Sequence, residues 1–478
     1  MLFNSIVFLV FAAIFYAVWP AVRKTRNPKF LVIVVFSFVF YGWWDWRFLL
    51  LIIGSGLLDY VAGLGIARWP ERRKFFLGVS ILGNVGSLAV FKYSGFIADN
   101  LSYLLSHLGL DVHLRASLPP FVLILPVGIS FYTFQSMSYT IDIYKGRMQP
   151  TRNPLHFFAY LSMFPQLVAG PIIRASDLLP QLLEYRPTTE EERWEGMRLV
   201  VHGYLKKVLI ADNLAYYVTE AFNSPTLVHG SLYWWVVMTA FAFQIYCDFS
   251  GYSDIARGLA RWMGYDFMLN FNHPYIATSL REFWSRWHIS LSTWFRDYVY
   301  IPLGGSRTTR LRSYLNMWIT MVVSGLWHGA AWNFVIWGGL HAAGLNLERI
   351  TGLPRRLAGY RWGRYAASLI LLVWVWVTWV FFRATSLHQA VTVVGEMFRF
   401  RGGWTELHAA FGGAALLNLA IVIGIAALRE SWFYFGFDQR RFLPRKLRFG
   451  FETATMAALI VIGVFFRGPG SKFIYFQF

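Results

Sequence analysis

Two histidines, each directly after a tryptophan, are the residues of this chain that most suggest chemistry. His288 follows Trp287, and His328 follows Trp327 forty positions further along. His328 lies near the middle of residues 317–347, an apolar run without Lys, Arg, Asp or Glu. Because an ionisable group in apolar surroundings costs free energy unless it has a partner or a task, we interpret it as a functional site. The matching tryptophans predict one shared site, in which a neutral imidazole takes a proton from an attacking hydroxyl.

Buried histidines can also have roles other than catalysis. A histidine can be a structural residue that packs or hydrogen-bonds across two helices, which is the role we favour for His341. The spacing of His288 and His328 matches no usual ligand pattern, so a metal site built from histidines is disfavoured and no metal is expected. The remaining ionisable residues that we single out in apolar stretches are Asp248 and Asp254.

The composition is that of a polytopic membrane protein. Of the 478 residues, 56% are hydrophobic and 14% are charged, and the mean hydropathy is +0.44. A soluble protein of this length carries roughly 25% charged residues. The net charge of +19 resides largely in short basic loops between apolar segments, which favours a cytoplasmic face near anionic lipid over nucleic-acid binding. The order of these loops predicts an N-terminus outside the cytoplasm. The first apolar run lacks a basic region before it and a small-residue cleavage site after it, which predicts a first helix that is retained rather than cleaved.

The apolar segments predict an all-α polytopic membrane protein with roughly 11 transmembrane helices plus interfacial and re-entrant helices. The candidate segments are 3–19, 30–53, 57–67, 75–91, 120–139, 155–168, 199–217, 232–246, 318–347, 366–382, 414–428 and 453–466. Several are too short to cross a bilayer upright, which is typical of tilted or broken helices packed against protein. Residues 315–348 must enter and leave the membrane between two basic loops. Each half holds about 16 residues, or about 24 Å, so we expect His328 at a hairpin tip or a break between half-helices.

Three polar stretches stand apart from these segments. In residues 280–305, apolar residues recur at three- and four-residue spacing, which predicts an amphipathic helix at the cytoplasmic interface or in a wet cavity. Residues 247–254, CDFSGYSD, lack the spacing of a serine nucleophile elbow, so we interpret them as a polar break in a helix. Thr189 and Glu192 have the spacing of a capping box and predict the start of a helix.

The polar and aromatic motifs of the chain resemble those of one known family. EFWSRWHISLSTWFRDYVYIPLGG (282–305) and SGLWHGAAWNFVIWGGLH (324–341) are similar to the two signature regions of membrane-bound O-acyltransferases. Further similar stretches lie at 164–172, 244–264, 270–279, 381–386 and 473–478. Within the family, the chain resembles the bacterial branch of alginate O-acetylation membrane proteins. The chain resembles the branch that exports D-alanyl groups to teichoic acid nearly as well.

The resemblance implies a fold with a defined layout. Members of the family have a helical membrane core with a funnel and a tunnel. We therefore expect one acyltransferase domain over 1–478, with N-terminal helices at 1–119, the core at 120–348 and C-terminal helices at 349–478.

The resemblance also implies site residues. His328 matches the position regarded as catalytic, so we expect it to act as a general base or transient acyl relay. His288 matches the second signature position and is expected to bind the acyl carbonyl or to orient an acceptor. The candidates for substrate or tunnel contacts are Trp327, Asn333, Asp248, Gln244, Arg286 and Arg296. The two arginines are expected to attract phosphates of the donor, and a plain solvated face is the open alternative.

The implied reaction moves an acyl group, in the first place acetyl, across the inner membrane for O-acetylation of an extracellular or periplasmic polysaccharide such as alginate. The donor is a cytoplasmic thioester, acetyl-CoA or an acyl carrier, used as a substrate, and no bound cofactor is expected. A periplasmic acetyltransferase is the expected partner, because the chain shows no appended hydrolase-like domain.

Three alternative functions are considered as well. D-alanyl transfer to teichoic acid would use the same fold. A transporter of an acylated precursor would show repeated halves, which the sequence lacks. A scaffold of a polysaccharide secretion complex would leave the histidines without a chemical role.

Overall fold

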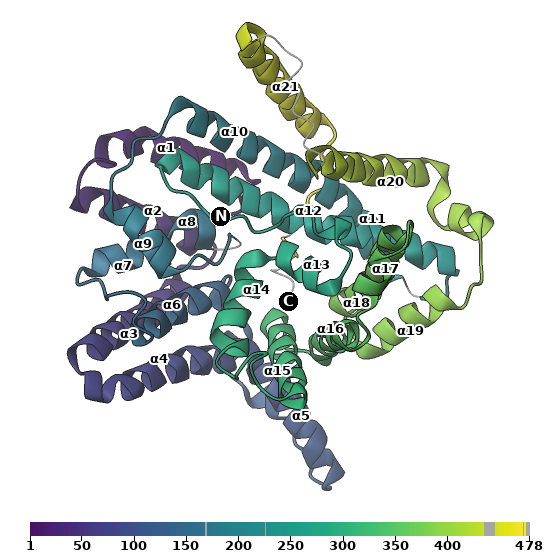
Figure 1. Cartoon of the computed structure of the whole chain (residues 1–478), viewed down its shortest axis with the longest axis horizontal. Helices are drawn as coiled ribbons and strands as arrows, with labels where there is room; N and C mark the ends of the chain where they lie inside the picture. The colour runs from purple at the N-terminus through teal and green to yellow at the C-terminus, as the bar shows by residue number, and fades with distance from the viewer. Residues whose placement is uncertain (168–169, 225, 435–444, 472, 475–478) are drawn as a thin grey trace. The chain divides into compact units, whose positions relative to one another are not determined.

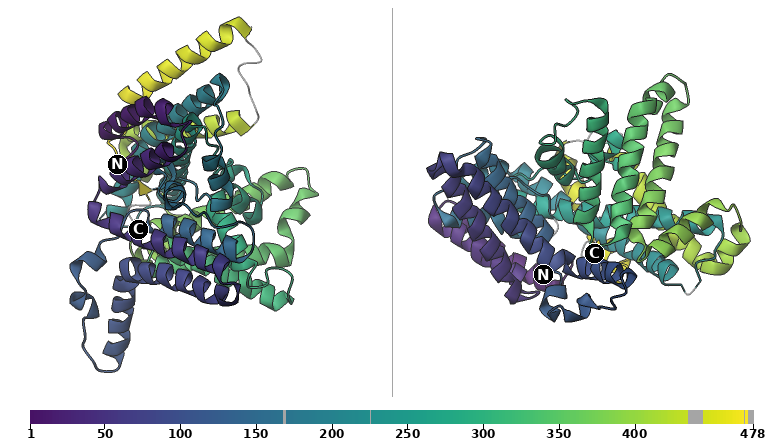
Figure 2. Two further views of the ribbon diagram at one scale, coloured as in Figure 1. Left: turned by 90° about the vertical axis from the view of Figure 1, so that its left-hand side faces the viewer. Right: turned by 90° about the horizontal axis from the view of Figure 1, so that it is seen from below.

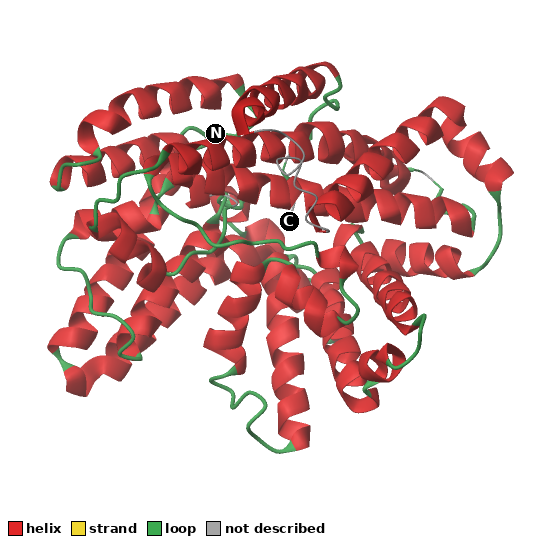
Figure 3. Ribbon diagram, turned by 45° about the horizontal axis from the view of Figure 1, so that its top comes forward, coloured by secondary structure: helices red, strands yellow, loops and turns green. Residues whose placement is uncertain are grey.

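The computed structural model describes residues 1–167, 170–224, 226–434, 445–471 and 473–474. Every regular element in these ranges is a helix, and none of them contains a strand (Figure 3). The predicted all-α class is confirmed. Part of the basic stretch 429–448 and most of the motif at 473–478 lie outside the described residues, as do two residues of the motif at 164–172.

The chain divides into two compact units. Unit 1 comprises Met1–Met197 and Ala256–Met268, and unit 2 comprises Arg198–Ile255 and Leu269–Phe478. The long helices α10 (Glu190–Tyr204) and α12 (Ser231–Met263) run from one unit into the other. The predicted division into 1–119, 120–348 and 349–478 stays a prediction.

The other α-helices of unit 1 are α1 (Ile6–Val22), α2 (Asn27–Gly42), α3 (Leu49–Arg68), α4 (Arg73–Leu88), α5 (Ser94–His107), α6 (Ile129–Tyr144), α7 (Pro154–Leu161), α8 (Phe164–Leu167) and α9 (Ala175–Leu183). Those of unit 2 are α11 (Asp212–Asn223), α13 (Leu280–Arg286), α14 (Ile289–Phe295), α15 (Arg310–His328), α16 (Trp332–Thr351), α17 (Leu353–Ala358), α18 (Gly363–Arg383), α19 (Leu387–Phe398), α20 (Trp404–Tyr434) and α21 (Arg445–Phe465). Short 3-10 and π-helical turns join several of them.

Local chemistry accounts for several helix ends. The capping box at the start of α10 is confirmed, since Thr189 N donates to Glu192 Oε2 at 2.9 Å and Glu192 N donates to Thr189 Oγ1 at 3.2 Å. The backbone hydrogen bond from Thr189 also lowers the pKa of Glu192 below its ordinary value. The predicted segment 30–53 is not one helix. It ends as α2 at Gly42, and Asp45 then accepts a hydrogen bond from Arg47 N and starts a new turn.

Within the described residues, four helical stretches are long and apolar enough to cross a membrane: Trp46–Arg68, Pro70–His107, Gly363–Arg383 and Trp404–Trp432. Three shorter apolar helices accompany them, Ile6–Val22, Asn27–Gly42 and Phe449–Phe465. These findings agree with a membrane protein, and the expected number of roughly 11 transmembrane helices stays a prediction. The end of Pro70–His107 projects from the other helices of unit 1, with residues 109–119 returning beside it (Figure 2).

A buried carboxylate fastens three helices of unit 1 together. Asp59 of α3 accepts hydrogen bonds from Asn84 Nδ2 of α4 at 2.8 Å and from Thr140 Oγ1 of α6 at 2.9 Å. Ser80 and Ser136 donate to the same carboxylate. These four donors satisfy a charged group that apolar surroundings would otherwise make costly.

The helix α12 runs without a break through residues 247–254, so the predicted polar break is wrong. The acidic side chains of this stretch form ion pairs with lysines. Lys206 Nζ lies 2.8 Å from Asp254, and Lys207 Nζ lies 2.9 Å from Asp248. A polar side chain that is paired across helices does not need to open the helix that carries it.

The helices α15 and α16 form a tight antiparallel pair with His328 at the turn (Figures 1 and 2). A Cβ atom on Gly325 would lie 2.1 Å from the carbonyl oxygen of Phe334, and one on Gly338 would lie 2.3 Å from that of Met321. Only glycine permits this approach of two backbones. The predicted break at His328 is confirmed, but the helices are longer than expected, with 19 and 20 residues.

Candidate active site

His288 occupies a strained junction between two short helices. The predicted single helix over 280–305 is wrong, because α13 ends at Arg286 and α14 begins at Ile289. Between them, His288 has a left-handed backbone conformation, with φ +42°, and its side chain is fully buried. A non-glycine residue with positive φ costs free energy and persists only where its surroundings fix it, often at functional sites.

The residue that fixes His288 is Asn270. Its Oδ1 lies 3.3 Å from His288 Nδ1 and accepts hydrogen bonds from Ser290 N at 3.2 Å and Ser290 Oγ at 2.9 Å. Its Nδ2 donates to Ser253 Oγ of α12 at 3.2 Å, and its carbonyl oxygen accepts from Ile289 N at 2.9 Å. Because Oδ1 is an acceptor, Nδ1 of His288 carries the proton, and Nε2 of the neutral ring is left as the basic nitrogen.

His328 is the last residue of α15, and its side chain is 4% exposed. Its ring packs against Trp327, Trp337 and Phe382, with centroid distances of 5.0, 4.9 and 5.3 Å. Gly329 follows in an extended conformation, and a Cβ atom there would lie 2.1 Å from the ring of Phe334. The helix ends at His328 because the backbone of Gly329 is extended, and the closeness of the Phe334 ring requires a residue without a side chain there.

Trp327 joins the two histidines. Its ring centroid lies 6.1 Å from that of His288 and 5.0 Å from that of His328, both in edge-to-face contact. The structure thus brings the two residues to one indole, as their flanking tryptophans led us to expect. This arrangement places two buried imidazoles against one indole, in surroundings that largely exclude bulk water from a proton transfer.

His341 lies in the same aromatic cluster but makes packing contacts. Its ring centroid is 4.8 Å from that of Trp337 and 5.0 Å from that of Trp284. Neither ring nitrogen has a hydrogen-bond partner among the described residues. Of the two roles foreseen for His341, packing is the one that the structure supports.

The remaining candidates have varied surroundings. Asn333 Nδ2 donates to the carbonyl of Ala384 at 2.8 Å, which ties the start of α16 to the residue after α18. Gln244 is buried in α12, 6% exposed, and its Oε1 has no partner within the described residues. Of these two, Gln244 is the one whose polar group is available to a ligand.

Both candidate arginines are paired with carboxylates. Arg286 NH2 lies 2.9 Å from Glu282, and Arg296 Nε lies 2.7 Å from Asp297. Their side chains are 21% and 58% exposed. Such pairing reduces the charge left for a phosphate, so the solvated-face alternative stays open beside the docking role.

Asp248 belongs to a buried ion cluster with Lys207, which the sequence analysis did not single out. Lys207 Nζ lies 2.9 Å from Asp248 and 2.8 Å from Asp212. The C-terminal segment closes the cluster, since Ser471 Oγ donates to Asp212 at 2.6 Å and Ile474 N donates to Asp248 at 2.8 Å. Asp248 is therefore engaged in holding this segment in place.

The sequence contained signals for the missed residues. Lys207 and Lys206 stand inside the apolar segment 199–217, where a charge implies a buried partner. Asn270 opens a motif that the resemblance already included, but nothing in its spacing tells which side chain it supports. The described residues contain no group of three His, Cys, Asp or Glu side chains placed to hold a metal ion.

Replacing Asn270 tests whether it positions His288. We expect Asn270→Ala to lower the rate of acyl transfer about 10- to 100-fold, because losing a buried hydrogen-bond partner costs about 1–3 kcal/mol. Asn270→Asp keeps the acceptor oxygen for His288 and Ser290, so it should retain more activity than the alanine variant. The comparison uses initial rates at equal amounts of folded protein. Equal losses for both variants would mean that Asn270 only supports the fold.

The apolar helices are those of an integral membrane protein, and the two buried histidines at helix ends are its candidate site. The model of MBOAT, the membrane-bound O-acyltransferase family, matches residues 149–387, which include both histidines. The chain belongs to this family, and it is an acyltransferase.

Several named relatives are similar over most of the chain. The "Probable alginate O-acetylase AlgI" of Pseudomonas putida is 42% identical over 84% of this chain and 81% of its own length. The "Peptidoglycan O-acetyltransferase" of Helicobacter pylori is 33% identical over 79% of this chain and 75% of its own length. The "Teichoic acid D-alanyltransferase" of Bacillus subtilis is 28% identical over 57% of this chain and 72% of its own length.

Proposed function

We propose that this protein takes an acetyl group from a cytoplasmic thioester and passes it across the inner membrane for O-acetylation of a polysaccharide outside the cytoplasm, such as alginate. The observation that carries the proposal is the convergence of His288 and His328 on Trp327 at breaks between helices. The names of the relatives support acetyl as the group and a cell-envelope glycan as its destination.

In the proposed reaction, His328 accepts the proton of an acceptor hydroxyl as that oxygen attacks the thioester carbonyl. The new acyl–oxygen bond forms, the acyl–sulfur bond breaks, and the proton passes from the imidazolium to the departing thiolate. A transient acyl group on His328 is the alternative route through the same residue.

His288 has two proposed tasks, and its hydrogen bond favours one of them. A neutral His288 that donates from Nδ1 to Asn270 has an accepting Nε2, which is able to orient an acceptor hydroxyl. Binding the acyl carbonyl would require a proton on Nε2 as well. We therefore assign His288 to orienting the acceptor.

The proposed setting is a multi-pass protein with its N-terminus outside. The donor, acetyl-CoA or an acyl carrier, reaches the site from the cytoplasmic face near α13 and α14, where Arg286 and Arg296 attract its phosphates. A periplasmic acetyltransferase receives the group and completes the transfer to the polymer. D-alanyl transfer is less well supported, because the D-alanyltransferase relative is less similar and covers less of the chain.

A donor experiment tests the proposal. Inside-out membrane vesicles carrying the protein receive either acetyl-CoA labelled in the acetyl group or a D-alanyl-charged carrier protein. We expect base-labile label from acetyl-CoA in membrane and glycan fractions, and none above the level of empty vesicles from the D-alanyl donor. If only the D-alanyl donor gives label, the proposal of acetyl transfer is wrong and the protein transfers D-alanyl groups.

A further inference from the structure

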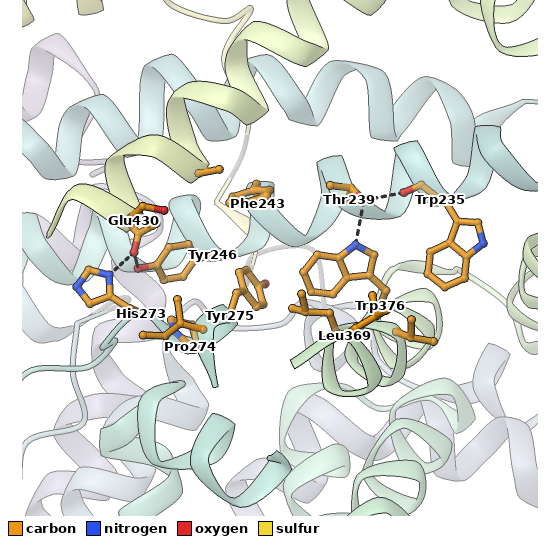
Figure 4. Close-up of a pocket in the computed structure, with 15 residues that line it drawn as sticks. Trp235, Thr239, Phe243, Tyr246, His273, Pro274, Tyr275, Leu369, Trp376 and Glu430 are labelled. Atoms are coloured by element: carbon orange, nitrogen blue, oxygen red, sulfur yellow. Dashed lines mark hydrogen bonds and ion pairs between the residues drawn. The ribbon is translucent and has the colours of Figure 1, made fainter. Parts of the chain in front are cut away.

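A cavity of about 460 Å³ lies in unit 2, and neither candidate histidine lines it. Its walls come from α12, the turn Pro274–Ile276, α18 and α20 (Figure 4). Tyr275 separates it from the histidines, because the ring of Tyr275 packs against Trp287 at 6.0 Å, one residue before His288. The volume is within the range of about 300–1,000 Å³ that small-molecule sites occupy.

Most of the cavity is apolar. Trp235 and Trp376 stand at one end (Figure 4), and their indole nitrogens are already bound to protein, to the carbonyl of Met397 at 3.0 Å and to Thr239 Oγ1 at 3.0 Å. The aliphatic residues Leu369, Leu372 and Val373 of α18 add to the apolar lining. A ligand that fits this part of the cavity has a long apolar chain and is held by apolar contacts rather than by hydrogen bonds.

Both outer walls are helices able to cross a membrane. α18 and α20 are both among the helices long and apolar enough to cross a membrane, and only 17% of the most apolar window of α20 is buried inside the protein. Side chains beside the cavity are correspondingly exposed, with Leu369 64% and Leu428 73% exposed. The medium around these helices is therefore lipid, which supplies apolar chains.

The opposite end of the cavity is polar, and two arginines that do not line it are bonded to residues at this end of α20. Glu430 Oε2 accepts hydrogen bonds from Tyr246 OH at 2.7 Å and His273 Nδ1 at 2.6 Å (Figure 4). Its Oε1 pairs with Arg429 at 2.7 Å. The carboxylate is thus satisfied by the protein, which leaves no demand for a cationic ligand. Arg364, at the start of α18, donates to Tyr434 OH at 3.2 Å, so a second guanidinium stands at this end of the two helices.

We propose that this cavity holds one acyl chain of an anionic phospholipid, with the phosphate at the end marked by Arg364, because Arg429 is already paired with Glu430. Basic residues between membrane helices attract anionic headgroups, each contributing about 1 kcal/mol. The lipid would support the wall formed by Tyr275 and Trp287 from the side away from the histidines. This inference does not depend on the acyl group that the enzyme transfers.

Lipid retention tests the proposal. The protein is placed in nanodiscs of equal parts phosphatidylglycerol and phosphatidylcholine, then released in detergent, and its bound lipid is counted by native mass spectrometry. We expect one retained phospholipid, with phosphatidylglycerol preferred about fivefold or more. If the wild-type protein retains no lipid, the proposal is wrong. If it retains the two lipids equally, the site does not select an anionic headgroup.

Paired variants locate the site. Val373→Trp and Ala427→Trp fill the cavity from its two outer helices and should each abolish retention. Leu428→Trp adds the same side chain next to Ala427 but outside the lining, and should retain lipid like the wild type. Arg364→Gln should keep the chain but reduce the preference for phosphatidylglycerol about fivefold. Unchanged retention in both cavity-filling variants, with folding confirmed by thermal unfolding, would place the lipid elsewhere.

Discussion

His328→Ala is expected to lower acyl transfer at least about 100-fold, the lower end of what a positioned general base contributes. The side chain is almost fully buried, ends α15 and packs against the rings of Trp327, Trp337 and Phe382. Because Gly329 and the contact of Gly325 with α16 define the turn, removing the imidazole should leave the helix pair in place. Initial rates of label transfer in membrane vesicles, normalised to folded protein, measure the effect.

His341→Ala is the matched control. His341 is also buried and packs against the same indole, with its ring 4.8 Å from that of Trp337 compared with 4.9 Å for His328. Both variants therefore leave a similar gap in one aromatic cluster, but only one removes the proposed base. If the two lose activity equally, the effect of His328→Ala comes from packing and the assignment of a base fails.

Lys207→Met is expected to destabilise the protein by about 3–5 kcal/mol, the cost of leaving a buried charge without its partner. Lys207 is 1% exposed and balances two carboxylates, Asp212 and Asp248. The same carboxylates hold Ser471 and Ile474, so the C-terminal segment should detach as well. Thermal unfolding in detergent measures the loss, and protease sensitivity of the C-terminal segment reports the detachment.

A compensated variant separates charge from packing in this cluster. Lys207→Met combined with Asp212→Asn and Asp248→Asn removes all three charges, and part of the stability should return because no ion is left uncompensated. A single Lys207→Met variant as stable as the wild type would mean that the buried ion cluster does not contribute as its geometry implies.

The sequence was sufficient where local pattern determines structure. The composition identified an all-helical membrane protein, and the apolar run around His328 located the turn between α15 and α16. Thr189 and Glu192 marked the start of α10, since capping needs only neighbouring residues.

The sequence-based predictions were wrong or incomplete where residues far apart in the sequence determine the local structure. The helix over 280–305 breaks because His288 is held in a left-handed conformation by Asn270, which is 18 positions away. Residues 247–254 stay helical because Lys207 pairs with Asp248, a partner that no local pattern identifies. Asp59 was missed for the same reason, since its donors Asn84 and Thr140 come from two other helices.

The most direct test of the central claim is the acetyl ester content of envelope polysaccharide from cells that produce the wild type, His328→Ala or His341→Ala at equal membrane abundance. We predict that His328→Ala abolishes acetylation while the polymer is still made and secreted, and that His341→Ala retains it. Full acetylation in the His328→Ala cells would contradict the account.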